Sequence, residues 1–235
     1  MFFSGCSLRC PWCHNPETIG GKEVTLRYKT TGRCETVGGE VCIDKIVGEL
    51  MWDKDYYDES GGGVTLSGGE ALLQVDAAAS IAEAMREAGV HVAIDTAGFA
   101  PREAVERLAP LADLWLYDIK TADAAKFAEV CGGDLSIVVG NLRFLAEAGA
   151  NVRVRVPLIP GISDGRGELE AIGKLVESLG LRTVDLLPFH RLGSSKYEAM
   201  GLEYAYKDVL PPDSDTVERA QAVFAPGFDV KVERH

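Results

Sequence analysis

The 235-residue sequence lacks the features that mark several large classes of protein. No stretch reaches the roughly 18 consecutive apolar residues that a membrane helix needs. The first residues show neither the charged nor the apolar region of a signal peptide. Basic residues are few, 24 against 36 acidic ones, and the formal net charge of −12 excludes a uniformly basic nucleic-acid or membrane-surface protein. We therefore expect a cytoplasmic protein with no nucleic-acid or membrane partner.

Cysteine is also scarce, and six cysteines are too few for a disulfide scaffold in a chain of this length. Three of them lie within eight residues and three are scattered: Cys6, Cys10 and Cys13, then Cys34, Cys42 and Cys131. Clustering of this kind favours a metal site in a reducing compartment over disulfides.

The order of apolar and polar segments predicts a single α/β domain over residues 1–235. Strands are predicted at residues 64–66, 90–95, 114–119, 152–158, 184–187 and 228–232. Helices are predicted at residues 43–57, 71–88, 101–108, 123–130, 140–148, 167–179 and 212–224. This alternation indicates βαβ units and a parallel sheet. Residues 18–41 are interpreted as polar turns, and residues 1–3 as the stump of a first strand.

Alternation within two strands indicates a sheet with one polar face. In residues 151–156 the valines share one face and Arg153 and Arg155 share the other, while Asp118 and Lys120 also share a face. Polar or Gly/Pro-rich segments follow the ends of five predicted strands, at residues 67–70, 95–96, 118–120, 157–161 and 188–190. Barrels of the TIM type place active sites at the C-terminal ends of their strands. We therefore expect a half-barrel with one shared site.

The clustered cysteines have the spacing CxxxCxxC over residues 6–13. Three thiolates on one short loop can bind one face of a [4Fe–4S] cluster, which leaves one iron open to a ligand from outside the protein. The alternatives are structural zinc, with His14 as a fourth ligand, and unrelated thiols. Zinc sites usually draw ligands from two pairs joined by a longer spacer, and this sequence lacks that spacing.

The CxxxCxxC motif, with Trp12 before its third cysteine, resembles the radical SAM superfamily. The longer strings FFSGC (residues 2–6) and CHNPE (residues 13–17) resemble its glycyl-radical-enzyme activating branch, the pyruvate formate-lyase activating enzyme type. Later segments resemble that branch in order: GGGVTLSGGEALLQ (61–74), DTAG (95–98), LYDIK (116–120), VPLIPG (156–161), LLPFH (186–190) and KYEAMGLEY (196–204). The resemblance covers nearly the whole chain.

This resemblance implies a fold, an activity and partners. The fold is a partial (βα)6 barrel of the TIM type, with the first strand apparently truncated. S-adenosylmethionine (SAM) binds the open iron, one electron cleaves it to methionine and a 5′-deoxyadenosyl radical, and the radical takes hydrogen from a glycine Cα of a glycyl radical enzyme such as pyruvate formate-lyase. The expected electron donor is a flavodoxin or ferredoxin-type protein, the setting is anaerobic, and we expect a monomer.

The same resemblance implies the residues that bind SAM: Trp12, Cys13, His14, Gly68, Gly69, Glu70, Asp118, Ile119, Lys120, Arg155 and His190. Lys120 and Arg155 are expected to pair with the SAM carboxylate, because bonds between cations and carboxylates are strong. Asp118 either belongs to this site or forms a buried salt bridge with one of them. Trp12 either packs against adenine or belongs to the core, and the backbone at Gly68 and Gly69 is expected to approach SAM.

Four residues match the positions at which the pyruvate formate-lyase type holds a monovalent cation: Asp95, Thr96, Asp118 and the Leu116 carbonyl. Oxygen ligands suit a hard cation. Cys34 and Cys42 are too few and too far apart for a second cluster, so we expect one cluster. Cys131 is interpreted as an ordinary buried thiol.

Two other functions compete with this interpretation. A radical SAM enzyme acting on a small molecule shares the cysteine motif but should lack the HNP and LLPFH strings. A zinc-binding interaction domain needs only the cysteines and His14, and it would be colourless after anaerobic purification.

Overall fold

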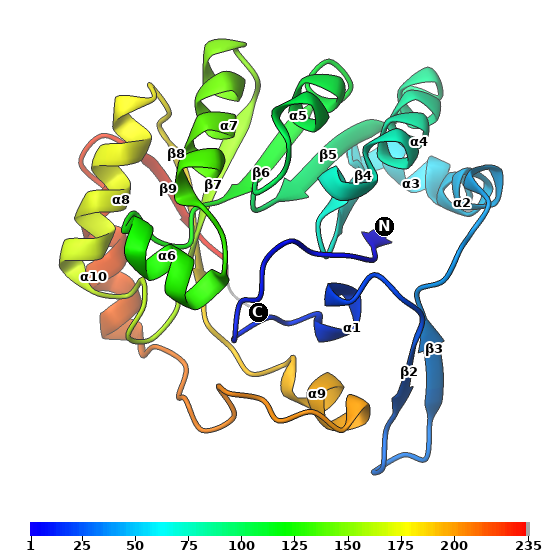
Figure 1. The fold of residues 1–235 in the computed structure, drawn as a ribbon. Helices are drawn as coiled ribbons and strands as arrows, with labels where there is room; N and C mark the ends of the chain where they lie inside the picture. Colours follow the sequence, from blue (N-terminus) through cyan, green and yellow to red (C-terminus); the bar gives the residue numbers. More distant parts are fainter. Residues whose placement is uncertain (234–235) are drawn as a thin grey trace.

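The structure, a computed structural model, describes residues 1–233 and is built on a seven-stranded, fully parallel sheet. In order across the sheet, the strands are β1 (Phe2–Phe3), β4 (Gly63–Gly68), β5 (His91–Thr96), β6 (Leu114–Asp118), β7 (Val152–Leu158), β8 (Thr183–Pro188) and β9 (Asp229–Val232). Among the described strands, β1 and β9 form two unjoined edges, so the sheet is a partial barrel (Figure 1). This confirms the predicted α/β class and parallel sheet.

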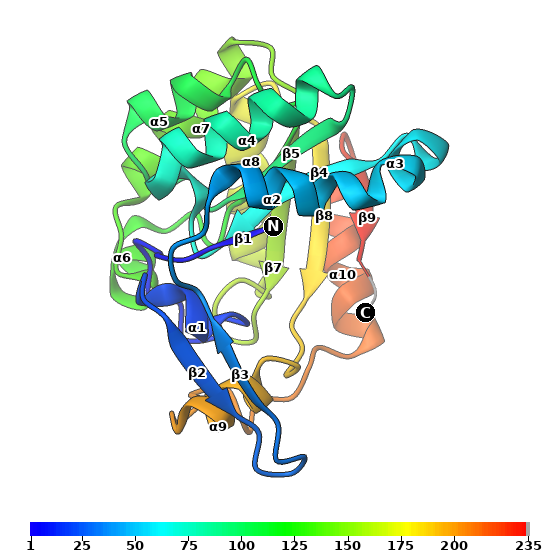
Figure 2. The ribbon, with the colours of Figure 1, turned by 90° about the vertical axis from the view of Figure 1, so that its right-hand side faces the viewer.

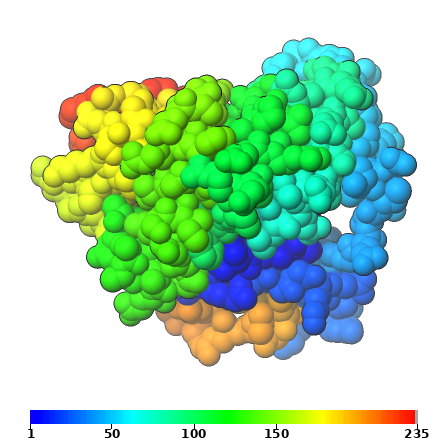
Figure 3. All heavy atoms as spheres, turned by 45° about the horizontal axis from the view of Figure 1, so that its top comes forward, coloured from blue at the N-terminus to red at the C-terminus, as the bar shows by residue number. Residues whose placement is uncertain are grey.

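Helices cover the outer face of the sheet (Figures 1 and 3). The outer helices are α4 (Val75–Glu87), α5 (Arg102–Leu108), α7 (Leu135–Glu147), α8 (Arg166–Ser178) and α10 (Ser214–Phe224). Valines of β7 are buried, as are Ile94 and Leu186 on neighbouring strands, and they form the core. Arg153 and Arg155 alternate with those valines and occupy the inner face, as the sequence pattern predicts.

The C-terminal ends of the strands point toward a group of segments that lie below the sheet in Figure 2. These segments are residues 4–15 (called the cysteine loop), α1 (Pro16–Ile19), and α9 (Ser194–Met200). The predicted stump of a first strand forms β1, which pairs Phe2 with Ser67 and Phe3 with Gly68. β1 therefore leads the chain directly from the edge of the sheet into the cysteine loop.

The interpretation of residues 18–41 as turns is wrong, because this segment contains an antiparallel hairpin of β2 (Val24–Arg27) and β3 (Cys34–Val37). β-Branched residues supply the strand propensity, with Val24 opposite Val37 and Thr25 opposite Thr36. Of the residues in these two strands only Leu26 is buried, so the hairpin has no apolar alternation to reveal it. β2 packs against α9.

Three helical segments also differ from the prediction. The helix predicted at residues 43–57 is two helices, α2 (Ile43–Leu50) and α3 (Lys54–Ser60), joined by a 3-10 turn (Met51–Asp53). The helix predicted at residues 71–88 begins with a 3-10 turn (Ala71–Gln74) before α4. The helix predicted at residues 140–148 begins earlier, because Asp134 caps α7 by accepting from the Ser136 amide. The helix predicted at residues 123–130 is confirmed as α6 (Ala124–Cys131).

No helix within residues 1–233 is both long and apolar enough to cross a membrane.

Candidate functional site

The cysteine loop and the C-terminal ends of β4 to β8 enclose a cavity of about 310 Å³. Thirteen of the residues predicted for the site line it: Cys6, Cys10, Trp12, Cys13, His14, Gly68, Gly69, Asp95, Thr96, Asp118, Lys120, Arg155 and His190. Three other predicted residues, Glu70, Leu116 and Ile119, are not part of its lining. The strand ends that the sequence predicts to meet do therefore meet at one site.

Backbone hydrogen bonds fix the cysteine loop over this cavity. The amides of Gly5 and Cys6 donate to the carbonyls of Thr18 and Ile19, at 2.6 and 3.2 Å. The Cys13 amide donates to the Cys10 carbonyl at 3.1 Å, which closes a tight turn between two of the cysteines. The loop thus presents three thiols to one cavity.

The donor set fits an iron–sulfur cluster better than a zinc ion. Cys6, Cys10 and Cys13 all line the cavity, yet among residues 1–233 no three His, Cys, Asp or Glu side chains are gathered closely enough to bind a single metal ion. A face of a four-iron cluster is wider than one ion and takes thiolates only. The His14 ring instead stacks on His190, with 4.1 Å between centroids, and its Nε2 lies 3.0 Å from the His190 carbonyl.

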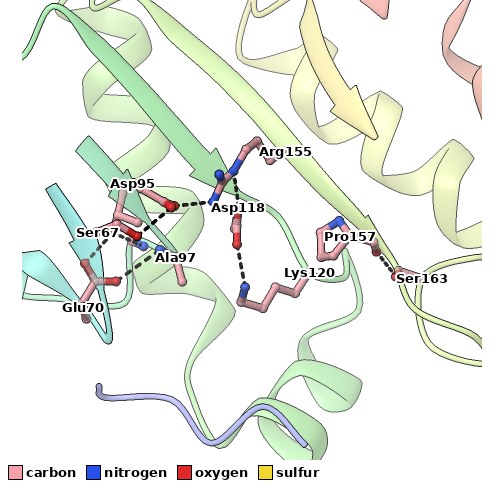
Figure 4. Close-up of polar contacts among 11 residues, drawn as sticks. Ser67, Glu70, Asp95, Ala97, Asp118, Lys120, Arg155, Pro157 and Ser163 are labelled. Carbon is pink, nitrogen blue, oxygen red and sulfur yellow. Dashed lines mark hydrogen bonds and ion pairs between the residues drawn. The ribbon is translucent and has the colours of Figure 1, made fainter. Parts of the chain in front are cut away.

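A charged network crosses the inner face of the sheet (Figure 4). Arg155 bridges two carboxylates: its Nε donates to Asp118 at 2.8 Å, and its Nη2 donates to Asp95. Lys120 donates to the other oxygen of Asp118 at 2.8 Å, and Ser67 donates to Asp95 at 2.8 Å. Asp118 therefore forms the salt bridges that the sequence analysis weighed, with both cations.

Burial and the charges of the network shift the pKa values of its members in different directions. Burial opposes the charged form of Asp118, but Arg155 and Lys120 hold its pKa below the usual range. Burial also raises the pKa of Asp95, and here it outweighs the attraction of Arg155. For Lys120, burial is outweighed by Asp118, which raises the pKa of the ammonium. Lys120 is thus a fixed positive charge facing the cavity.

Three of the four residues predicted to hold a monovalent cation, Asp95, Thr96 and Asp118, are engaged with other groups in this structure. The guanidinium of Arg155 binds the carboxylates of both Asp95 and Asp118. The Thr96 hydroxyl donates to Glu70 at 2.7 Å and accepts from the Gly98 amide at 2.8 Å. Arg155 thus already supplies positive charge to the carboxylates of Asp95 and Asp118, and the monovalent cation remains a prediction.

Gly68 and Gly69 are required by the close approach of the chain to itself. A Cβ on Gly68 would lie 2.2 Å from the Phe3 nitrogen, and one on Gly69 would lie 2.2 Å from the Gly5 oxygen. Gly68 also has a φ of +117°, which side chains rarely adopt. The glycine pair allows β4 to pass beside β1 and the start of the cysteine loop, and both residues still line the cavity.

Glu70 joins the ends of two strands from behind the cavity. It is only 1% exposed, and its carboxylate accepts from the Thr96 hydroxyl at 2.7 Å and from the amides of Leu72 and Ala97, both at 3.2 Å. Burial raises the pKa of Glu70 to about 7, although these hydrogen bonds lower it. Glu70 therefore holds the strand ends that form the site, and its own side chain does not line the cavity.

The raised pKa of Glu70 predicts a pH-dependent contribution to stability. Because its folded pKa lies above the ordinary value of 4.5, the contribution is full below pH 4.5 and is lost as pH rises through 7. Relative to Glu70→Gln, the metal-free wild-type protein should therefore lose up to about 3 kcal/mol of unfolding free energy between pH 5 and pH 8. Urea unfolding at both pH values measures this loss. Glu177→Gln, in an exposed ion pair with Arg182, is the control, and parallel pH slopes for wild type and E70Q would refute the assignment.

An aromatic wall on one side of the cavity includes residues that the sequence analysis missed. Tyr206 packs edge-on against Trp12 and Phe189, at centroid distances of 5.9 and 5.5 Å. The Tyr204 hydroxyl donates to the Trp12 carbonyl at 3.5 Å. Trp12 is buried, as the core interpretation requires, and it also lines the cavity; its packing against adenine stays a prediction. Tyr197, Tyr204 and Tyr206 are the sequence signal that could have predicted this wall. The sequence analysis used residues 196–204 only for the family resemblance.

Lys196 is a second missed residue, and it connects α9 to the cysteine loop. Its ammonium donates to the Asn15 side chain at 2.7 Å and to Glu17 at 2.5 Å. Gly193, just before α9, lies so close to the loop that a Cβ there would be 2.9 Å from the His14 Cα. These contacts join the segment that begins KYEAMGLEY to the CHNPE segment.

Comparisons with known proteins give similarities over most of the chain. A family model described as the radical SAM superfamily matches residues 1–172. Pyruvate formate-lyase 2-activating enzyme of Escherichia coli (strain K12) is 38% identical over 233 residues, covering 92% of this chain and 80% of the relative. Trans-4-hydroxy-L-proline dehydratase activating enzyme of Clostridioides difficile is 32% identical over 278 residues, covering 99% of this chain and 92% of the relative. A crystallised domain of pyruvate-formate lyase-activating enzyme from Bacteroides vulgatus ATCC 8482 shares the fold, with a TM-score of 0.62, 24% identity and coverage of 74% of this chain and 99% of that one.

Proposed function

Because the chain belongs to the radical SAM superfamily and to its branch of glycyl-radical-enzyme activating enzymes, we propose that it installs a glycyl radical on a partner such as pyruvate formate-lyase. The observation that carries this proposal is the cavity in which three thiols meet the C-terminal ends of the strands. The similarity to activating enzymes with different named partners, in Escherichia coli and Clostridioides difficile, supports the class of partner.

Cys6, Cys10 and Cys13 are the residues that would hold one [4Fe–4S] cluster. When bound, the cluster supplies the electron that cleaves SAM to methionine and a 5′-deoxyadenosyl radical, which takes hydrogen from a glycine Cα. The protein positions these groups and excludes competing reactions. With all three cysteines in the lining, the cysteine loop closes one side of the cavity.

The charged network supports a role for Lys120 and Arg155 in binding the SAM carboxylate. An ammonium has three donors, and Lys120 gives one to Asp118, so it can bind a second anion without releasing the first. The stacked rings of His14 and His190, with Phe189 beside His14, offer a flat surface for adenine. Glu70 holds the ends of β4 and β5 in register behind these groups.

The remaining parts of the proposal concern partners and setting. Within the described residues 1–233 the sheet ends at β1 and β9 without closing, which favours entry of a glycine-bearing loop from another protein. We assign the reaction to an anaerobic cytoplasm, with a flavodoxin or ferredoxin-type electron donor and the enzyme as a monomer. A monovalent cation at Asp95, Thr96, Asp118 and the Leu116 carbonyl belongs to the same proposal.

Anaerobic reconstitution tests the proposal in two stages. The protein should take up four irons and four sulfides, become coloured, and release 5′-deoxyadenosine from SAM when reduced. Addition of pyruvate formate-lyase should then give a doublet EPR signal from the glycyl radical. A colourless, zinc-loaded protein would overturn the cluster, and SAM cleavage with no doublet would overturn this choice of partner.

A further inference from the structure

Glu168 is not among the residues that line the cavity, and the reaction described above gives it no role. It lies in the first turn of α8, the helix that follows β7, and its side chain is 11% exposed. Its Oε1 atom accepts hydrogen bonds from the Thr121 hydroxyl at 2.8 Å and from the Ala122 amide at 2.7 Å. One carboxylate of α8 therefore holds the segment that follows the neighbouring strand, β6.

The segment that Glu168 holds begins directly after Lys120, which faces the cavity. On the N-terminal side of Lys120, the Ile119 amide donates to the Arg155 carbonyl at 2.9 Å and continues the sheet by one residue. On its C-terminal side, the next two residues along the chain both donate to Glu168. The backbone of Lys120 thus lies between two fixed points, while its ammonium binds Asp118 (Figure 4).

The second carboxylate oxygen of Glu168 connects a third segment to this one. It accepts from the ammonium of Lys126, on α6, at 2.6 Å, and Lys126 also donates to the Ile162 carbonyl at 3.1 Å. Ile162 belongs to the turn after β7, in which Ile159 lines the cavity. Burial opposes the charge of Glu168, but the hydrogen bonds from α6 and from the segment after β6 hold its pKa below the usual range. Glu168 is thus an ionised acceptor at neutral pH that joins the ends of β6 and β7.

We propose that Glu168 is a positioning residue, which fixes the backbone beyond Lys120 and thereby places the Lys120 ammonium for the carboxylate of SAM. This inference rests on the proposed function, in which Lys120 binds that carboxylate. The stem of a lysine is long and flexible, so its ammonium keeps one place only while both its ion pair and its backbone are held. A binding group that moves by a fraction of its contact distance loses much of its effect.

Isothermal titration calorimetry of SAM into the anaerobically reconstituted, oxidised protein tests this role without turnover. Glu168→Ala should raise the Kd for SAM about tenfold, because the group that binds the carboxylate is no longer held in place. During turnover, the KM for SAM should rise by the same factor, while kcat at saturating SAM changes by less than about twofold, as expected when only substrate binding is weakened.

Two further variants make the test specific to the hydrogen bonds of Glu168. Glu168→Gln keeps one oxygen acceptor for the segment after β6, and its Kd for SAM should stay within about threefold of wild type. Glu170→Gln lies on the same helix, in an exposed pair with Arg166, and it is the matched control that should leave the Kd unchanged.

A double-mutant cycle decides whether Glu168 acts through Lys120. Lys120→Met removes the ammonium and should itself raise the Kd for SAM. Because Glu168 is proposed to act only by placing that ammonium, Glu168→Ala should raise the Kd by less than about twofold further in the Lys120→Met background. An equal rise in both backgrounds would show that Glu168 acts apart from Lys120, and it would overturn the proposal.

The remaining outcomes separate this inference from the proposed function. A wild-type Kd in E168A, whatever its urea midpoint or iron content, would show that Glu168 supports only the fold. Glu168→Asp keeps the charge on a shorter side chain, and it decides the question in the same way if the alanine variant does not fold. A wild-type Kd in K120M would overturn the role of Lys120 and this inference with it. The proposed function fails if the wild-type protein takes up no cluster or cleaves no SAM.

Discussion

Replacing Cys13 with alanine is expected to abolish cluster binding and SAM cleavage, while the same replacement of Cys42 leaves both intact. A cubane face held by three thiolates has no spare ligand, and no fourth cysteine lines the cavity within the described residues. Cys13 lies at the end of the turn closed by its amide and the Cys10 carbonyl. Removing its sulfur should therefore lower iron content to background and 5′-deoxyadenosine formation by more than a thousandfold.

The comparison separates cluster ligands from other cysteines. Cys6→Ala and Cys10→Ala should match Cys13→Ala, whereas Cys34 and Cys42 are exposed and are not among the residues that line the cavity. Iron and sulfide analysis, the visible spectrum and SAM cleavage are measured on all five variants. A Cys13→Ala protein that retains a full cluster, or a Cys42→Ala protein that loses it, contradicts the assignment of ligands.

Much of the fold follows from the sequence because parallel strands are buried. In residues 152–158 and 184–187, apolar side chains recur at every second position and Arg153, Arg155 and Asp185 fall between them, because helices cover only one face of these strands. The site follows from the same strands, because the polar residues after each strand must collect at one edge of a parallel sheet. Asp118, Lys120 and Arg155 were placed together on this ground, and the structure joins them in one network.

The parts that the sequence does not reveal depend on contacts between distant residues. Lys196 binds Glu17 across 179 positions, and the Thr96 hydroxyl meets Glu70 across 26. Neither pairing leaves a periodic pattern, because each involves a single polar side chain. The hairpin of β2 and β3 was missed for a related reason: its residues are mostly exposed and form no apolar stripe.

Gly68 and Gly69 show how a correct motif can carry an incomplete explanation. The sequence suggests that glycine lets a ligand approach the backbone, and both residues do line the cavity. The space that a Cβ would occupy, however, is filled by Phe3 and Gly5 of the same chain. Local patterns indicate that space is needed, and only the assembled sheet shows what fills it.

Replacing Asp118 with asparagine is expected to destabilise the metal-free protein by about 3–5 kcal/mol, because it leaves buried cations without a balancing charge. Lys120 and Arg155 both bind the Asp118 carboxylate, and their side chains are only 11% and 14% exposed. Arg155 retains Asp95 after the substitution, but Lys120 loses its carboxylate partner. Urea unfolding of the metal-free protein measures the loss without any contribution from the cluster.

Two comparisons make this expectation specific to the buried network. Glu170→Gln removes the carboxylate from an exposed pair with Arg166 and should change stability by less than about 1 kcal/mol. The pKa of Asp118 is lowered in the folded protein, so its contribution is present above the usual pKa of about 3.9 and is lost as pH falls through the folded value. The difference between wild type and D118N should accordingly stay constant from pH 8 to pH 5. Equal urea midpoints for the two proteins would show that the stability of the fold does not depend on the Asp118 carboxylate.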